Sequence, residues 1–244
     1  MRARGALFVI AALVVSAFAT QGASAQTSAT AYTCSSTATT KEFSDSHCTT
    51  KPGTGFGHVE IPVATKTKKG LEAATPSAVL KWTTSGIGVS LTAGAVEVEE
   101  ASPGEPAFIV NRAGPPMEAF GEGRMKLLNV TANHSCLVNG SASATLTTQR
   151  LKTHTVSPTE FEIEPATASA DVFFTLSSCS IAALNKTWAV EGSAIGSISG
   201  ATIAFTHTAV TTQGTTRTLS GTSLVGLEAT LVITGENGNP ISFT

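Results

Sequence analysis

The feature that most constrains this chain is an alternation of apolar and polar residues with a period of two. In TEFEIEP (159–165), Phe161 and Ile163 fall on one face and three glutamates fall on the other. Successive side chains of a strand point to opposite faces, so this pattern predicts half-buried β-strands. The same period recurs along much of the chain, in segments 95–100, 142–148, 171–177, 201–210 and 226–234.

Turn-forming residues separate these segments at short intervals. They include Gly86, Gly94, Asn139-Gly140, Gly192, Gly200, Gly214, Gly221 and Asn237-Gly238-Asn239-Pro240. Many short strands between such turns predict an all-β fold, an antiparallel β-sandwich or a barrel-like arrangement with short strands and long loops, stapled by disulfides. In residues 101–123, Pro and Gly surround one short apolar run, and we expect a loop or a seam between two lobes there.

The first 25 residues have the pattern of a signal peptide. Arg2 and Arg4 precede an apolar stretch of about fifteen residues, and small residues at 23–25 favour cleavage before Gln26. A membrane-spanning helix needs about twenty apolar residues, which no later segment approaches. We therefore expect a secreted, extracellular chain with no membrane span after cleavage. Its organisation would be a signal peptide (1–25), a disulfide-closed segment (26–57) and a β-rich region (58–244).

The chain has four cysteines, Cys34, Cys48, Cys136 and Cys179. Thiols outside the cytoplasm oxidise, and four cysteines allow three pairings. The shortest loops would pair Cys34 with Cys48 and Cys136 with Cys179. In the chain-entropy model, these bridges stabilise the folded state by about 3 and 4 kcal/mol because they restrict the unfolded chain. A zinc knuckle would need closely spaced cysteines, and a Cys–His nucleophile would need a free thiolate. Disulfides are thus the expected role, and we expect no metal or cofactor.

The residue types and motifs of the chain argue against most kinds of catalytic site. Aspartate occurs only at positions 45 and 171, and no G-x-S-x-G, S-x-x-K or H-E-x-x-H motif is present. The net charge of -2 lacks the basic surface that a nucleic-acid partner requires. We interpret Asp45 and His47 as part of a polar loop tip, and His207 as a core histidine. Trp82 and Trp188 are expected to anchor the core.

Glutamates form the strongest alternative site. They cluster in two segments, as Glu97, Glu99 and Glu100 and as Glu160, Glu162 and Glu164. Such carboxylates could hold a cation or catalyse glycoside hydrolysis, which in retaining enzymes needs two carboxyl groups about 5–5.5 Å apart. Exposed glutamates also keep sheets soluble and block edge-to-edge pairing, and we favour that role.

The order YTC…FSDSHC, LKWTTSGIGVSL, CLVNG, FEIEP and CSIAALNKTWAVEGS resembles a group of secreted bacterial all-β proteins of unknown function. These have a short Cys-closed N-terminal stretch and a later cysteine pair, and the resemblance covers most of residues 31–234. It implies an exported all-β protein with a Cys136–Cys179 bridge, and it implies no site.

We therefore expect an exported, non-catalytic cell-envelope or extracellular protein that serves as a binding, adhesion or structural module for an unknown ligand. One alternative is a secreted hydrolase that uses paired glutamates on β-strands. Another is an outer-membrane barrel, which an aromatic content of 6% disfavours because such barrels carry aromatic girdles.

Overall fold

The structure, a computed structural model, describes most of the chain after residue 27. The described residues are 28–46, 48–63, 72–73, 78–114, 117–167, 170–206, 218–219, 223–235 and 238–243. The expected signal peptide, His47 and His207 lie outside them. Within the described part, no helix has the length and apolar character needed to cross a membrane.

Eight antiparallel strands form a closed ring, which confirms the predicted all-β, barrel-like architecture. Each strand pairs with the next, and the last pairs with the first. In ring order the strands are β4 (Ala78–Thr84), β5 (Ile87–Ala93), β8 (Glu118–Ala132), β11 (Leu151–Ser157), β12 (Glu160–Pro165), β15 (Ala194–Ser199), β16 (Thr202–Phe205) and β18 (Ser223–Thr234).

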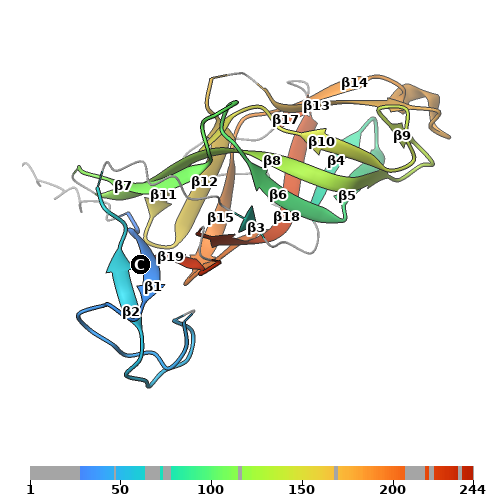
Figure 1. Cartoon of the computed structure of the whole chain (residues 1–244). Helices are drawn as coiled ribbons and strands as arrows, with labels where there is room; N and C mark the ends of the chain where they lie inside the picture. Colours follow the sequence, from blue (N-terminus) through green and yellow to red (C-terminus); the bar gives the residue numbers. More distant parts are fainter. Residues whose placement is uncertain are drawn as a thin grey trace, which may run out of the picture.

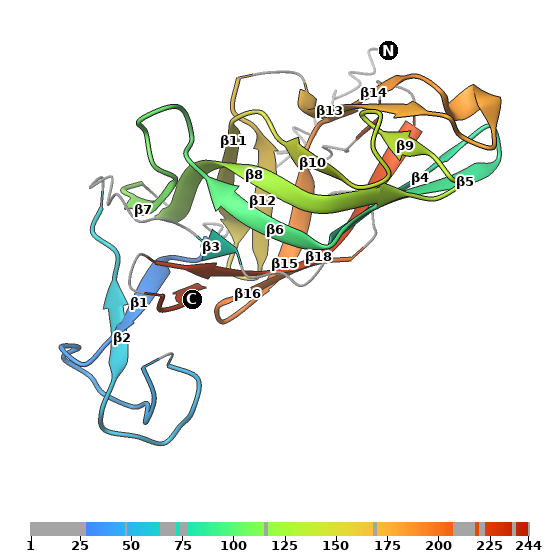
Figure 2. The ribbon, with the colours of Figure 1, turned by 45° about the vertical axis from the view of Figure 1, so that its right-hand side comes forward.

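The long strand β8 organises one side of the ring and crosses the molecule in both views (Figure 1 and Figure 2). Besides β5 and β11, three shorter strands pair along its two edges: β6 (Ala95–Glu99), β7 (Phe108–Arg112) and β10 (Ala144–Thr147). Segment 101–123 therefore contains β7 and the first part of β8, where a loop or seam was expected. Its apolar run 107–110 is buried, and Pro103, Gly104, Pro106 and Gly114 lie in the connections around β7.

A second sheet extends from β18 and covers one end of the ring. It consists of β9 (Leu137–Val138), β13 (Ala170–Ser177), β14 (Thr187–Glu191) and β17 (Thr218–Leu219), while β3 (Glu72–Ala73) pairs with the far end of β18. A 3-10 turn, η1 (Ala182–Leu184), precedes β14. Figure 1 shows β13 and β14 above β4 and β5, which makes this end a sandwich.

The alternating segments bury the faces that the sequence predicts. Phe161 and Ile163 of β12 face the interior of the ring, and Trp82 and Trp188 are almost completely buried. The ring of Trp82 lies 5.6 Å from that of Trp188, measured between centroids, so the two tryptophans join β4 to β14 across the sandwich. Val172, Phe174 and Leu176 are buried on the same face of β13.

A small three-stranded sheet sits at the other end of the ring, in the order β19 (Ile241–Phe243), β1 (Ala31–Ser35), β2 (Gly57–Glu60). It projects from the ring at the lower left of Figure 1. The fully buried side chain of Asn111 on β7 connects it to the ring. Its Oδ1 accepts a hydrogen bond from Ala31 N at 2.8 Å, and its Nδ2 donates to Ala31 O at 3.0 Å and Ile61 O at 2.9 Å.

Candidate functional site

Two adjoining apolar cavities lie inside the ring, each of about 50 Å³. Both are lined by Met125, Leu151 and Ile163, so they meet between β8, β11 and β12. The first cavity continues toward Ala78 and Ala93, and the second continues toward other aliphatic residues and Phe161. A cavity needs about 10–15 Å³ to hold one water molecule, so each of these cavities is larger than an ordinary packing gap.

Two paired alanines of the lining, Ala78 and Ala93, help to explain the space in the first cavity. Ala93 of β5 is paired with Ala78 of β4, which is paired in turn with Ala229 of β18. Residues paired directly across a sheet point to the same face, and all three are buried. An eight-stranded ring has room for side chains to fill its interior or for one small ligand. The methyl groups of Ala78 and Ala93 leave part of that room empty.

The glutamates of β6 have the exposed, ion-paired role expected of them. Lys126 on β8 lies 3.9 Å from Glu97 and 3.3 Å from Glu99, measured from Nζ to the carboxylate oxygens. Arg124 Nη2 is also 4.0 Å from Glu99. These contacts are cross-strand pairs of opposite charge on a partly exposed face, which stabilise a sheet modestly.

The glutamates of β12 differ, and for Glu162 the expectation of an exposed side chain is wrong. Only 5% of Glu162 is exposed, and the row of paired residues to which it belongs contains other buried side chains. Glu162 pairs with His154 of β11, His154 pairs with Phe120 of β8, and Phe120 pairs with Val110 of β7. The row lies on the face opposite Phe161 and Ile163, and Phe120 and Val110 are buried there in a separate apolar cluster. Alternation therefore identifies the correct face, but that face is partly covered.

His154 lies between two carboxylates of β12. Its Nε2 is 3.4 Å from Glu162 Oε2, and its Nδ1 is 3.9 Å from Glu164 Oε1. One ligand atom from each of the three residues lies within 4.8 Å of the others. On β11, Lys152 Nζ is 3.0 Å from Glu164 Oε1. The sequence pattern indicates the two glutamates but not His154, which becomes their neighbour only through the β11–β12 register.

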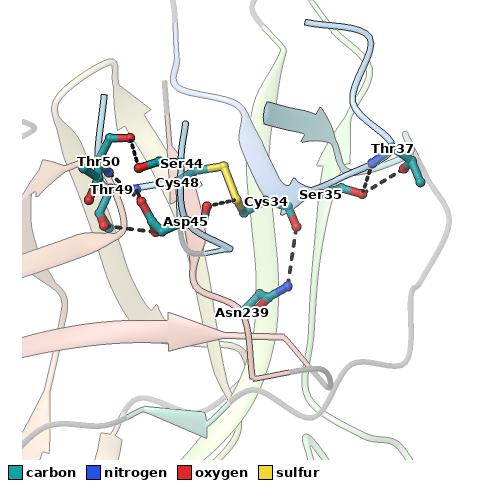
Figure 3. Close-up of a disulfide and its surroundings, with 9 residues drawn as sticks. All are labelled: Cys34, Ser35, Thr37, Ser44, Asp45, Cys48, Thr49, Thr50 and Asn239. Atoms are coloured by element: carbon teal, nitrogen blue, oxygen red, sulfur yellow. Dashed lines mark hydrogen bonds between the residues drawn. A yellow bond between two sulfur atoms is a disulfide. The ribbon is translucent and has the colours of Figure 1, made fainter. Parts of the chain in front are cut away.

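The disulfides join the cysteines that give the shortest loops. Cys34 is bridged to Cys48, with their Cα atoms 5.6 Å apart, and Cys136 is bridged to Cys179. Figure 3 shows that Asp45 lies beside the first bridge and organises the turn. Its carboxylate accepts hydrogen bonds from Thr49 N at 3.2 Å and Thr50 N at 2.7 Å. Asp45 thus has the structural role that a polar loop tip predicts.

His58 of β2 lies directly opposite Cys34 of β1, beside the Cys34–Cys48 bridge. Its ring lies 4.9 Å from that of Phe43 and 5.8 Å from that of Tyr32, measured between centroids. Burial lowers the pKa of His58, the positive charge of Lys51 lowers it further, and Glu42 opposes the shift. Its Nε2 has no hydrogen-bond partner among the residues that the structure describes. This site is enclosed and aromatic, and it supports the small sheet beside the Cys34–Cys48 bridge.

No family model matches the chain, and no curated protein or solved structure is detectably similar to it. The resemblance to secreted bacterial proteins of unknown function therefore stays a prediction.

Proposed function

We propose that the chain is an exported, non-catalytic binding module that holds a small apolar molecule inside its ring. The interior cavity is the observation that carries this proposal. The two disulfides support a location outside the cytoplasm, because such bonds persist where the surroundings are oxidising. The resemblance to secreted bacterial proteins points the same way.

The chemistry of the lining determines the class of ligand. Leu91, Met125, Leu151 and Ile163 present only aliphatic groups and a thioether to the first cavity. The hydroxyl group of Thr148 also lines it, but its oxygen already accepts a hydrogen bond from Met125 N at 2.9 Å. Dry cavities lined by such residues bind small hydrocarbons, because a polar molecule would leave its hydrogen bonds in water. Each cavity, at about 50 Å³, is smaller than the roughly 150 Å³ that holds benzene, so the expected ligand is a small uncharged hydrocarbon that extends across both cavities.

The arrangement of strands argues against a hydrolase that combines glutamates of β6 and β12. Strands β8 and β11 lie between them, so three strand spacings separate the two segments. At about 4.8 Å each, these spacings place the carboxylates roughly 14 Å apart along the sheet. Glycosidases need about 5–5.5 Å for retention or about 6.5–9.5 Å for inversion. This separation supports the non-catalytic interpretation.

Thermal denaturation with toluene tests the proposal. At ten times its Kd, toluene should stabilise the chain by about 1.4 kcal/mol and raise the Tm by about 3–6 °C. Ala93→Leu should fill the first cavity and abolish this shift. Thr92→Leu adds a similar side chain at the next position of β5, which is exposed, and should keep the shift.

Two results would overturn the proposal. One is the absence of any Tm shift in the wild-type chain at saturating toluene. The other is an equal shift in the wild type and Ala93→Leu, because binding would then occur elsewhere. If Ala93→Leu does not fold, Ala78→Val adds less volume to the same cavity and replaces it in the comparison.

A further inference from the structure

Three ionisable side chains, His154, Glu162 and Glu164, gather on the outer face of β11 and β12, away from the interior cavities. Glu162 is almost completely buried, and its cross-strand neighbours are His154 on β11 and Ile195 on β15. Glu162 makes further polar interactions besides the one with His154, so its burial alone does not require a metal ion. What points to a metal ion is the position of its carboxylate beside His154 and Glu164.

The spacing of the ligand atoms fits a metal ion. Bonds of about 2.0–2.2 Å in a tetrahedral zinc site place neighbouring ligand atoms roughly 3.3–3.6 Å apart. His154 Nε2 and Glu162 Oε2 are 3.4 Å apart. Glu164 is two residues from Glu162 on the same strand, and its ligand atom belongs to the same group within 4.8 Å. Its side chain is 27% exposed, so rotation of the carboxylate can complete the set.

We propose that His154, Glu162 and Glu164 form a divalent metal site, with Zn²⁺ as the ion that one imidazole and two carboxylates suit. Two ligands come from neighbouring residues of one face of β12, and the third is directly opposite on β11. Paired strands hold the backbones of all three in place. Three protein ligands leave a fourth position for water. This proposal is independent of the apolar ligand, because the metal would bind on the outer face.

Substitution of Lys152 distinguishes a metal site from a network of ion pairs without a metal ion. The Lys152 ammonium group lies 3.0 Å from Glu164 Oε1 and competes with a metal ion for that oxygen. The Lys152 side chain is 38% exposed and can move into solvent. Lys152→Met should therefore strengthen zinc binding several-fold. In a network without metal, the same change would only remove a partner of Glu164.

Isothermal titration of the EDTA-treated, dialysed chain with Zn²⁺ tests the proposal. We expect one site per chain, weakened at least tenfold in His154→Ala and in Glu162→Gln. Titration with Co²⁺ provides a second readout, because a tetrahedral site gives intense visible absorption that His154→Ala should abolish. If Glu162→Gln does not fold, the partly exposed Glu164→Gln replaces it and should show the same loss.

His134→Asn is the matched control. His134 is a partly exposed histidine two residues beyond the end of β8, whereas His154 pairs with Phe120 near the start of that strand. The Nε2 atom of His134 is 2.8 Å from Gly88 O, and asparagine tolerates its positive φ of 57°. This variant should bind Zn²⁺ like the wild type. The proposal is overturned if the folded wild-type chain takes up no Zn²⁺, or if His154→Ala binds it as tightly as the wild type does.

Discussion

Asn111→Ala should destabilise the chain strongly, because this buried amide joins the small sheet to the ring. The Asn111 side chain makes three hydrogen bonds, one with Ala31 N, one with Ala31 O and one with Ile61 O. Ala31 O also accepts from Ile61 N at 3.1 Å, so this carbonyl keeps a partner after the substitution. The substitution therefore mainly removes the Asn111 hydrogen-bond partner of the Ala31 N–H and of the Ile61 carbonyl.

The expected magnitude follows from these two groups. Leaving a buried donor or acceptor without a partner costs about 1–3 kcal/mol for each group. Two such groups and the loss of the third bond give a loss of about 3–5 kcal/mol. Domains have total stabilities of about 5–15 kcal/mol, so the variant should unfold at a clearly lower urea concentration.

Urea denaturation followed by circular dichroism measures this loss. Asn133→Ala is the control, because this exposed amide also bonds two backbone groups, Ser90 N and Gly88 O, but water can replace both bonds, so its loss should cost about 1 kcal/mol or less. A loss below about 1 kcal/mol in Asn111→Ala would refute the reasoning, since the three bonds would then not hold the small sheet in place.

Three further predictions concern the scaffold. Gly121→Ala should cost about 2–3 kcal/mol in a urea titration, because a Cβ would lie 2.6 Å from Phe108 O, whereas Gly88→Ala meets no atom within 4 Å and should be neutral. Because burial lowers the pKa of His58, the free energy of unfolding should fall as the pH drops below about 6.5. His58→Gln should make the free energy of unfolding less dependent on pH between about pH 7 and 5. The same pH dependence in the variant and the wild type would contradict this prediction. Replacing both Cys136 and Cys179 with alanine should cost about 4 kcal/mol, measured by the same titration, and a neutral effect would show that the 43-residue closure contributes nothing.

Local patterns in the sequence predict the strands well because a strand needs only a period of two. Phe161 and Ile163 point into the ring, and Trp82 and Trp188 anchor the sandwich, as alternation and size predict. The shortest-loop pairing of the cysteines also agrees with the structure. These properties depend on neighbouring residues or on compartment chemistry.

Closure of the ring could not be predicted in the same way. It depends on β16 pairing with β18 and on β5 pairing with the end of β8 through Leu91 and Thr92, contacts between distant segments. Glu162 lies in one row with Phe120 and Val110, which are two and three strands away and are also buried. Nothing local distinguishes Glu162 from the exposed glutamates of β6. Both candidate sites thus arise from strand register.

Methyl-resolved NMR of the wild-type chain with added toluene tests the central claim most directly. Binding inside the ring predicts the largest chemical-shift changes at the methyl groups of Leu91, Met125, Leu151 and Ile163. Val110, which is buried in the apolar cluster on the outer face, should remain unchanged. If the lining methyl groups do not shift at saturating toluene, or if Val110 shifts instead, the interior of the ring is not the binding site.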